Sequence, residues 1–281
     1  MKTPKSQPLL LQSQHITDLY CLVDDLVPEE ERKTGRPALL SQNEVITILA
    51  WNAFALRQKT LKDLHRSIRL YHAGDFQVPA YTTFVTACHR ALPAAFALLT
   101  LLLDDTAPVR LMDATMLPVC KLHRADSYKT ARNLTAFGKN WQGFHYGFKL
   151  HASIAPDGVL SGLALTAANV YDAQAMLAIL NEHCRVAVGD TLYGARVMGK
   201  KVKEAYGTVI IAPPWPKQRK KVATDWQIKL LDWRSKIESV FDFLKEHLHL
   251  VSSFPRSRGG YLLHYVRVLL GYQMMAVLSR G

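Results

Sequence analysis

The sequence predicts an α/β fold in which a mixed five-stranded sheet carries helices on both faces and follows an all-helical N-terminal domain. Two observations lead to this prediction. Apolar residues recur at helical spacing through the first hundred residues, whereas short runs of strand-like character take over after Pro108. The elements expected after Pro108 have the order β, β, β, α, β, α, β, α, whereas doubly wound parallel folds alternate strand and helix from the start. We therefore expect two domains, residues 1–105 and 106–281.

The N-terminal domain is expected to contain four short helices. They are predicted over residues 42–56, 61–70, 82–92 and 94–103. Ser41 is expected to cap the first helix, because Glu44 follows three residues later and completes a capping box. Thr60 should cap the second helix, with Asp63 three residues on. Pro93 is expected to end the third helix, because proline has no N–H for the helical hydrogen-bond pattern.

The third of these helices could read DNA. Three short helices in this order fit a helix-turn-helix-like module, with Thr82, Thr83 and His89 as the reading residues. The spacer before this helix, HAGDFQVPAY, is longer than the usual turn of such modules. A plain helical bundle that serves as a lid or a dimer surface is therefore the alternative.

The segment after Pro108 is expected to form the sheet. Strands are predicted over residues 109–115, 144–155, 159–166, 185–188 and 208–212, and helices over 172–183, 194–206, 224–250 and 261–278. Pro156-Asp157-Gly158 is strong turn chemistry between the second and third strands. Three antiparallel strands followed by αβ units are the plan of a ribonuclease-H-like fold. In that plan the first and fourth strands are neighbours.

Three acidic residues occupy informative positions in this plan. Asp113 lies among apolar residues in the first strand, Asp190 directly follows the fourth strand, and Glu238 lies on the long helix expected to pack against the sheet. A carboxylate in an apolar strand is costly to desolvate unless it is paired or binds a metal. Neighbouring strand ends would bring Asp113 and Asp190 together, where a divalent cation relieves their repulsion. Three unrelated surface acids are the alternative.

Magnesium is the cofactor that this set of ligands suits. It prefers carboxylate and phosphate oxygens and retains several of its waters, and Mn²⁺ is expected to support the same activity. Two such ions about 3.5–4 Å apart can activate a water or hydroxyl and stabilise a leaving oxygen. The predicted catalytic and metal-binding residues are therefore Asp113, Asp190 and Glu238.

The segments LMDATMLPVC, VGDTLYGA and WRSKIESVFDFLK resemble the three acidic motifs of bacterial insertion-sequence transposases of the DDE class. Arg234, Glu238 and Lys245 match the Arg-x3-Glu-x6-Lys part of that family's Tyr-Arg-Glu-Lys pattern, while Leu231 stands at the tyrosine position. GKNWQGFHYGFKLH, which ends in Lys149-Leu-His151, is similar to the family's second-strand region.

The resemblance implies a ribonuclease-H-like core related to retroviral integrases. It further implies metal-dependent cleavage and strand transfer at terminal inverted repeats of a mobile element, with double-stranded DNA as partner and a homodimer in the DNA complex. A structure-specific nuclease and an inactive DNA-binding regulator derived from a transposase are the alternatives.

The charge of the chain agrees with a polyanionic partner. Lys and Arg number 35 against 23 Asp and Glu, which gives a net charge of +12. The predicted DNA-contacting residues are Arg234, Lys245, Lys149, His151, Trp215, Lys217, Arg219, Lys220 and Lys221. A basic, proline-flanked loop can also be merely solvated, which is the alternative for the last five. No apolar run reaches the length of a membrane helix, so we expect a cytoplasmic protein without a membrane partner.

Overall fold

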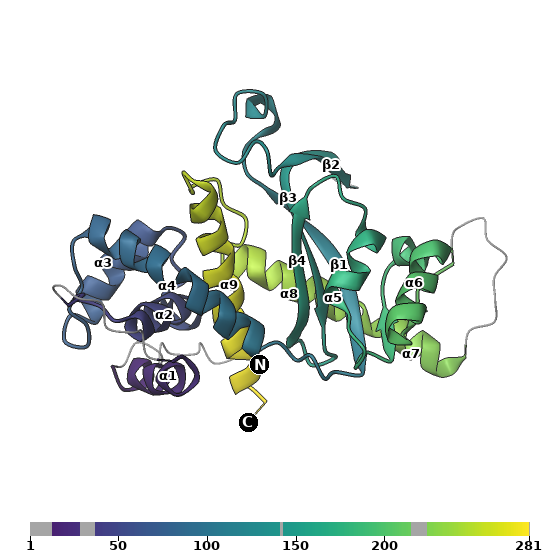
Figure 1. Ribbon diagram of the computed structural model, residues 1–281, viewed down its shortest axis with the longest axis horizontal. Coiled ribbons are helices and arrows are strands. Elements are labelled where there is room, and N and C mark those ends of the chain that lie inside the picture. The colour runs from purple at the N-terminus through teal and green to yellow at the C-terminus, as the bar shows by residue number, and fades with distance from the viewer. Residues whose placement is uncertain (1–12, 29–36, 141–142, 215–223, 281) are drawn as a thin grey trace, which may run out of the picture. The chain divides into compact units, whose positions relative to one another are not determined.

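The structure is a computed structural model, and it describes residues 13–28, 37–140, 143–214 and 224–280 (Figure 1). The chain forms two compact units. One contains the described residues up to Leu102 together with 246–250 and 254–280, and the other contains residues 103–245 and 251–253. Each unit has its own core.

The helical unit follows the predicted capping pattern. Its elements are α1 (Ser13–Leu26), α2 (Gln42–Trp51), the π-helix η2 (Asn52–Leu56), α3 (Leu61–Tyr71), α4 (Tyr81–Leu101) and α9 (Arg258–Leu278). Ser41 and Glu44 form the predicted capping box at α2. The Thr60 hydroxyl accepts the backbone N–H of Asp63 at the start of α3. These local predictions are confirmed.

The prediction that Pro93 ends a helix is wrong. Helix α4 continues through Pro93 to Leu101, so the predicted third and fourth helices are one helix. Proline removes one helical hydrogen bond and crowds the preceding turn. Buried residues on both sides of it, among them Phe84 and Leu98, hold the helix together across this defect.

The C-terminal helix α9 packs in the helical unit, against α2 and α4. This position differs from the predicted boundary, which assigned all residues after 105 to the catalytic domain. Gly271 explains part of the packing, because a side chain there would collide with Ala53. Both α4 and α9 have the length and apolar composition of a membrane-crossing helix, but core helices share these properties. In α9, 67% of the most apolar window is buried.

Arg267 of α9 lies in the core of the helical unit. It is 2% exposed and donates a hydrogen bond of 2.7 Å to the Lys59 carbonyl oxygen. Burial lowers its pKa to about 10. A side chain so enclosed serves to hold the α2–α3 connection and cannot contact DNA.

The second unit is built on a six-stranded mixed sheet. Its strands are β1 (Val109–Pro118), β2 (Ala136–Asn140), β3 (Gly143–Ile154), β4 (Leu160–Ala167), β5 (Val186–Val188) and β6 (Val209–Ile211). β1 pairs antiparallel with β3 and parallel with β5, and β5 pairs parallel with β6. β2 and β4 share the other edge of β3, each along a different part of it.

The ribonuclease-H-like order predicted from the sequence is confirmed, including the adjacency of the first and fourth predicted strands, β1 and β5. The strand missed by the prediction is β2. Its sequence, AFGKN, is short and contains glycine and two polar residues, so it carries little alternating pattern.

Helices cover the sheet, and they are shorter than predicted. They are η3 (Leu122–Arg124), η4 (Asp172–Ala175), α5 (Met176–Ile179), η5 (Thr191–Gly194), α6 (Arg196–Tyr206), α7 (Asp225–Trp233), α8 (Ser235–Asp242) and the π-helix η6 (Phe243–His247). α5 and α6 pack on the apolar cluster that includes Met112 of β1, and α8 also contacts β1. The single helix predicted over 224–250 is therefore a succession of α7, α8 and η6 with a turn at Arg234.

Candidate active site

The register of β1 and β5 brings Asp113 and Asp190 together. The last residue pair between these parallel strands is Leu111 with Val188. Asp113 follows Leu111 by two residues, and Asp190 follows Val188 by two residues. Because parallel strands advance at the same rate, the two carboxylates arrive at the same level of the sheet. β5 ends at Val188, so the pocket opens where β1 loses its neighbour on this edge.

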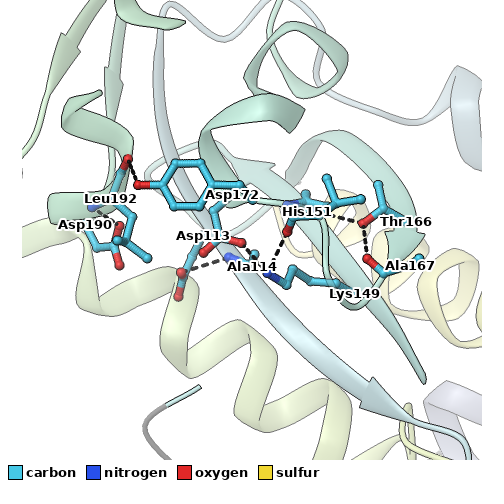
Figure 2. A network of polar contacts seen from close by, with 11 residues as sticks. Asp113, Ala114, Lys149, His151, Thr166, Ala167, Asp172, Asp190 and Leu192 are labelled. Atoms are coloured by element: carbon cyan, nitrogen blue, oxygen red, sulfur yellow. Dashed lines mark hydrogen bonds and ion pairs between the residues drawn. The ribbon is translucent and has the colours of Figure 1, made fainter. Parts of the chain in front are cut away.

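Local backbone interactions fix both carboxylates. Oδ1 of Asp190 accepts the backbone N–H of Leu192 at 2.9 Å and so caps η5. Oδ1 of Asp113 accepts the N–H of Ala114 at 2.8 Å. Gly189 is required between β5 and η5, because a Cβ there would lie 2.6 Å from the ring of Tyr193. Figure 2 shows the two acids from neighbouring elements beside the Lys149 network.

Burial makes both carboxylates hard to ionise. The pKa of Asp113 is raised to about 7, chiefly by burial; the hydrogen bond from Ala114 and the charge of Arg234 act against this rise, and the charges of Asp190 and Glu238 add to it. The pKa of Asp190 is also raised, chiefly by burial, against the hydrogen bond from Leu192. A site that holds two poorly solvated acids side by side favours a compensating cation.

Glu238 faces the same pocket from α8. Its carboxylate forms an ion pair of 2.7 Å with Arg234, one helical turn earlier, and it is half exposed. Lys245, in the π-helical turn η6, lines the pocket as well. The pocket has a volume of about 540 Å³ and is lined by Asp113, Asp190, Arg234, Glu238 and Lys245, with further residues of β1, β2, β3 and η4. The third predicted motif is therefore brought to the two strand-end acids.

The residues present fit a magnesium site in their chemistry. Within the described part of the chain, no three His, Cys, Asp or Glu side chains are arranged to surround an ion as they stand. Asp113 nevertheless uses only Oδ1 in its hydrogen bond with Ala114, and the carboxylates of Asp113 and Asp190 line the same pocket. Magnesium is commonly bound by one or two carboxylates together with waters and substrate phosphates. Glu238 would complete the ligand set by leaving its ion pair with Arg234 and binding the ion instead.

Lys149 and His151 occupy positions different from those expected of DNA contacts. Nζ of Lys149 donates to the Asp172 carboxylate and to the Val170 carbonyl, each at 2.8 Å, and only 11% of the side chain is exposed (Figure 2). His151 is fully buried, with its Nε2 2.9 Å from the Thr166 hydroxyl. Burial lowers the pKa of His151 to about 4. A neutral, enclosed imidazole does not suit the predicted DNA contact.

Asp172 is a fourth acid of this site and is not one of the three predicted ligands. From the sequence alone, Asp172 could be an acid beside the metal ligands or, more simply, the N-cap of a helix. In the structure it lies in the first turn of η4, and its carboxylate pairs with Lys149. It also lines the pocket. The one available signal is Lys149 itself, because a lysine in a buried strand needs an anionic partner.

The predicted basic loop cannot be placed by the structure. Trp215, Lys217, Arg219, Lys220 and Lys221 all lie outside the described residues. Arg234 and Lys245 thus remain the predicted DNA contacts that line the described pocket without being buried.

Comparison with known families agrees with this geometry. The family model described as "Transposase DDE domain" matches residues 104–258, which is more than half of the chain and includes all three acids. A search of curated proteins gives no match. With its mixed sheet, its two strand-end aspartates and a helix-borne glutamate in one pocket, the chain belongs to the transposase DDE-domain family.

Proposed function

We propose that this transposase binds the terminal inverted repeats of an insertion sequence, cleaves DNA there and transfers the freed 3′ end to a target. The observation that carries the proposal is the convergence of Asp113, Asp190 and Glu238 on one pocket in a chain of this family. We expect it to act in the cytoplasm as a homodimer on double-stranded DNA.

The three acids would hold Mg²⁺, or Mn²⁺ in its place. The ion, when bound, would polarise a water or the 3′ hydroxyl of the DNA and stabilise the leaving oxygen of an in-line displacement. Asp113 and Asp190 are positioned for this role by β1 and by the cap of η5. Their burial also limits access of bulk water, which strengthens electrostatic interactions inside the pocket.

Arg234 and Lys245 would hold the DNA backbone beside the acids. Both are cations in a pocket that also contains Lys139, Lys149 and five acidic residues, Asp113, Asp172, Asp190, Glu238 and Asp242. A phosphate between cation and carboxylate would bind Arg234 through two parallel N–H donors. In the structure, Oε1 of Glu238 pairs with one of these nitrogens, Nη1, at 2.7 Å. DNA binding would thereby release Glu238 toward the metal.

The distinguishing experiment is a strand-transfer assay. Purified protein is incubated with a labelled element end, a target plasmid and Mg²⁺. The proposal predicts target molecules joined covalently to the labelled 3′ end. Cleavage without joined product would favour the structure-specific nuclease, and binding with neither product would favour the regulator.

Recognition of the element ends is assigned in this proposal to the helical unit. Thr82 and Thr83 are exposed at the start of α4, whereas His89 is partly buried and faces Gly259 of α9. The two threonines are therefore the better candidates for contacts to DNA. A fragment that ends at residue 105 would lack α9 and expose its partners, so the full chain is the proper material.

We expect the double substitution Thr82→Ala and Thr83→Ala to weaken binding to the terminal repeat by about 10-fold, since a lost base contact costs roughly 1–3 kcal/mol. Binding to scrambled DNA should change little. Competition gel shifts with both DNAs measure the ratio. Thr100→Ala, another exposed threonine of α4, is the matched control. An unchanged preference for the repeat would move end recognition elsewhere.

A further inference from the structure

We propose that Asp172 and the hydroxyl of Tyr193 hold a water of the hydration shell of the ion bound by Asp113 and Asp190, and that Lys149 serves to position Asp172. The inference rests on the proposed metal site and extends it to a second layer of residues. None of these three residues belongs to the three acidic positions of the family motif.

Lys149 fixes Asp172 at the edge of the pocket. The ion pair joins the two side chains at 2.8 Å, and Nζ is also held by the Val170 carbonyl at the same distance. Only 17% of the Asp172 side chain is exposed. Oδ1 is the oxygen that Lys149 holds, and Oδ2 has no hydrogen-bond partner among the residues that the structure describes. Asp172 thus has one oxygen that is fixed in place and free to accept a hydrogen bond. The opposite charges of Lys149 and Asp172 cancel.

Tyr193 contributes a donor from the apolar cluster that contains Met112 and Ala173, the sequence neighbours of Asp113 and Asp172. Its side chain is fully buried in the cluster around Met112, and its hydroxyl has no hydrogen-bond partner in the structure as described. Burial is the main reason that its pKa is raised, and the charges of Asp172, Asp113 and Asp190 raise it further. The hydroxyl is therefore protonated and has a proton to donate. A buried, unused hydroxyl is unusual and calls for a water or ligand.

A water between Asp172 and Tyr193 would satisfy both groups. It could donate to Oδ2 of Asp172 and accept from the Tyr193 hydroxyl. Magnesium keeps several waters when protein carboxylates bind it, and groups around the ligands of a metal commonly change its affinity 10–100-fold. The alternative is that Asp172 is merely the counter-ion of Lys149.

The test is Mn²⁺ binding to the full-length protein, measured by isothermal titration calorimetry without DNA. The key variant combines Lys149→Met and Asp172→Asn, because it removes both charges and leaves no buried ion unpaired. We expect its Kd for Mn²⁺ to rise about 10-fold or more. Tyr193→Phe should also raise the Kd, with no decrease in the melting temperature of the metal-free protein, since no hydrogen bond is lost.

Tyr206→Phe is the matched control. Its hydroxyl packs in the same cluster but donates to the Leu177 carbonyl at 3.0 Å, so its loss should lower the melting temperature without changing the Kd. Wild-type Mn²⁺ affinity in both the double variant and Tyr193→Phe would overturn the inference while leaving the three-acid site intact. Absence of Mn²⁺ binding in the wild-type protein would overturn the proposed metal site and this inference with it.

Discussion

Asp113→Asn, Asp190→Asn and Glu238→Gln should each reduce strand cleavage by about a thousandfold or more, which corresponds to roughly 4 kcal/mol of transition-state stabilisation. The reason is that each removes a ligand of the proposed ion, while the amide keeps the shape of the side chain. Single-turnover cleavage of a labelled element end in Mg²⁺ measures the rate. Affinity for the uncut end should change little, because the helical unit is proposed to carry recognition.

The melting temperature separates loss of catalysis from loss of folding. The pKa of Asp113 rises from its ordinary value of 3.8 to about 7 in the folded protein. The folded state therefore keeps this proton at pH values where the unfolded state has already lost it. The free energy of unfolding consequently falls as the pH rises from about 4 to about 7. Without metal at pH 8, Asp113→Asn should melt above the wild type, and the difference should shrink toward pH 4. If Asp113→Asn, Asp190→Asn or Glu238→Gln cleaves at the wild-type rate, the substituted residue is not a ligand of the catalytic ion.

Arg234→Ala and Lys245→Ala should each slow cleavage and strand transfer by roughly one to two decades. Charge-assisted contacts to phosphate contribute about 1.5–3 kcal/mol, and each 1.36 kcal/mol felt in the transition state is tenfold in rate. Arg234→Lys should recover only part of the loss, since a single ammonium cannot replace two parallel donors. Arg234 pairs with Glu238 at 2.7 Å. Arg234→Ala would free Glu238 for the ion, so this substitution should not weaken Mn²⁺ binding.

Lys200→Ala is the control for general loss of positive charge. Its side chain is 79% exposed on α6 and pairs with Glu204 rather than lining the pocket. We expect no more than a small change in its cleavage rate. Wild-type rates in Arg234→Ala and Lys245→Ala, or a loss explained by a lower melting temperature, would make both cations structural and reduce the third motif to Glu238.

The central acids could be predicted from the sequence because their position follows from short-range rules. An aspartate inside an apolar strand and another directly after a second buried strand converge whenever those strands are parallel neighbours. The caps at Ser41 and Thr60 are equally local, since each depends on a partner three residues away. Local patterns of this kind leave a clear trace in one sequence.

The remaining features depend on contacts between distant residues. Lys149 and Asp172 are 23 residues apart, and the pattern around each suggests a separate role, a phosphate contact and a helix cap. Helix α9 packs closely where Gly271 lies against Ala53. The spacing of apolar residues in the sequence does not indicate this contact. Helix α4 continues through Pro93 because the burial of side chains on both sides of it outweighs the low helix propensity of proline.

A change of metal requirement at Asp113 tests most directly whether this residue binds the catalytic ion. Asp113→Cys replaces a carboxylate oxygen with a thiolate, which binds Mn²⁺ better than the harder Mg²⁺. We expect this variant to be inactive in Mg²⁺ and to regain a measurable part of its single-turnover cleavage in Mn²⁺, whereas Asp113→Ala should regain none. Equal activity of Asp113→Cys in both metals, or equal rescue of Asp113→Ala, would contradict a direct contact between Asp113 and the catalytic ion.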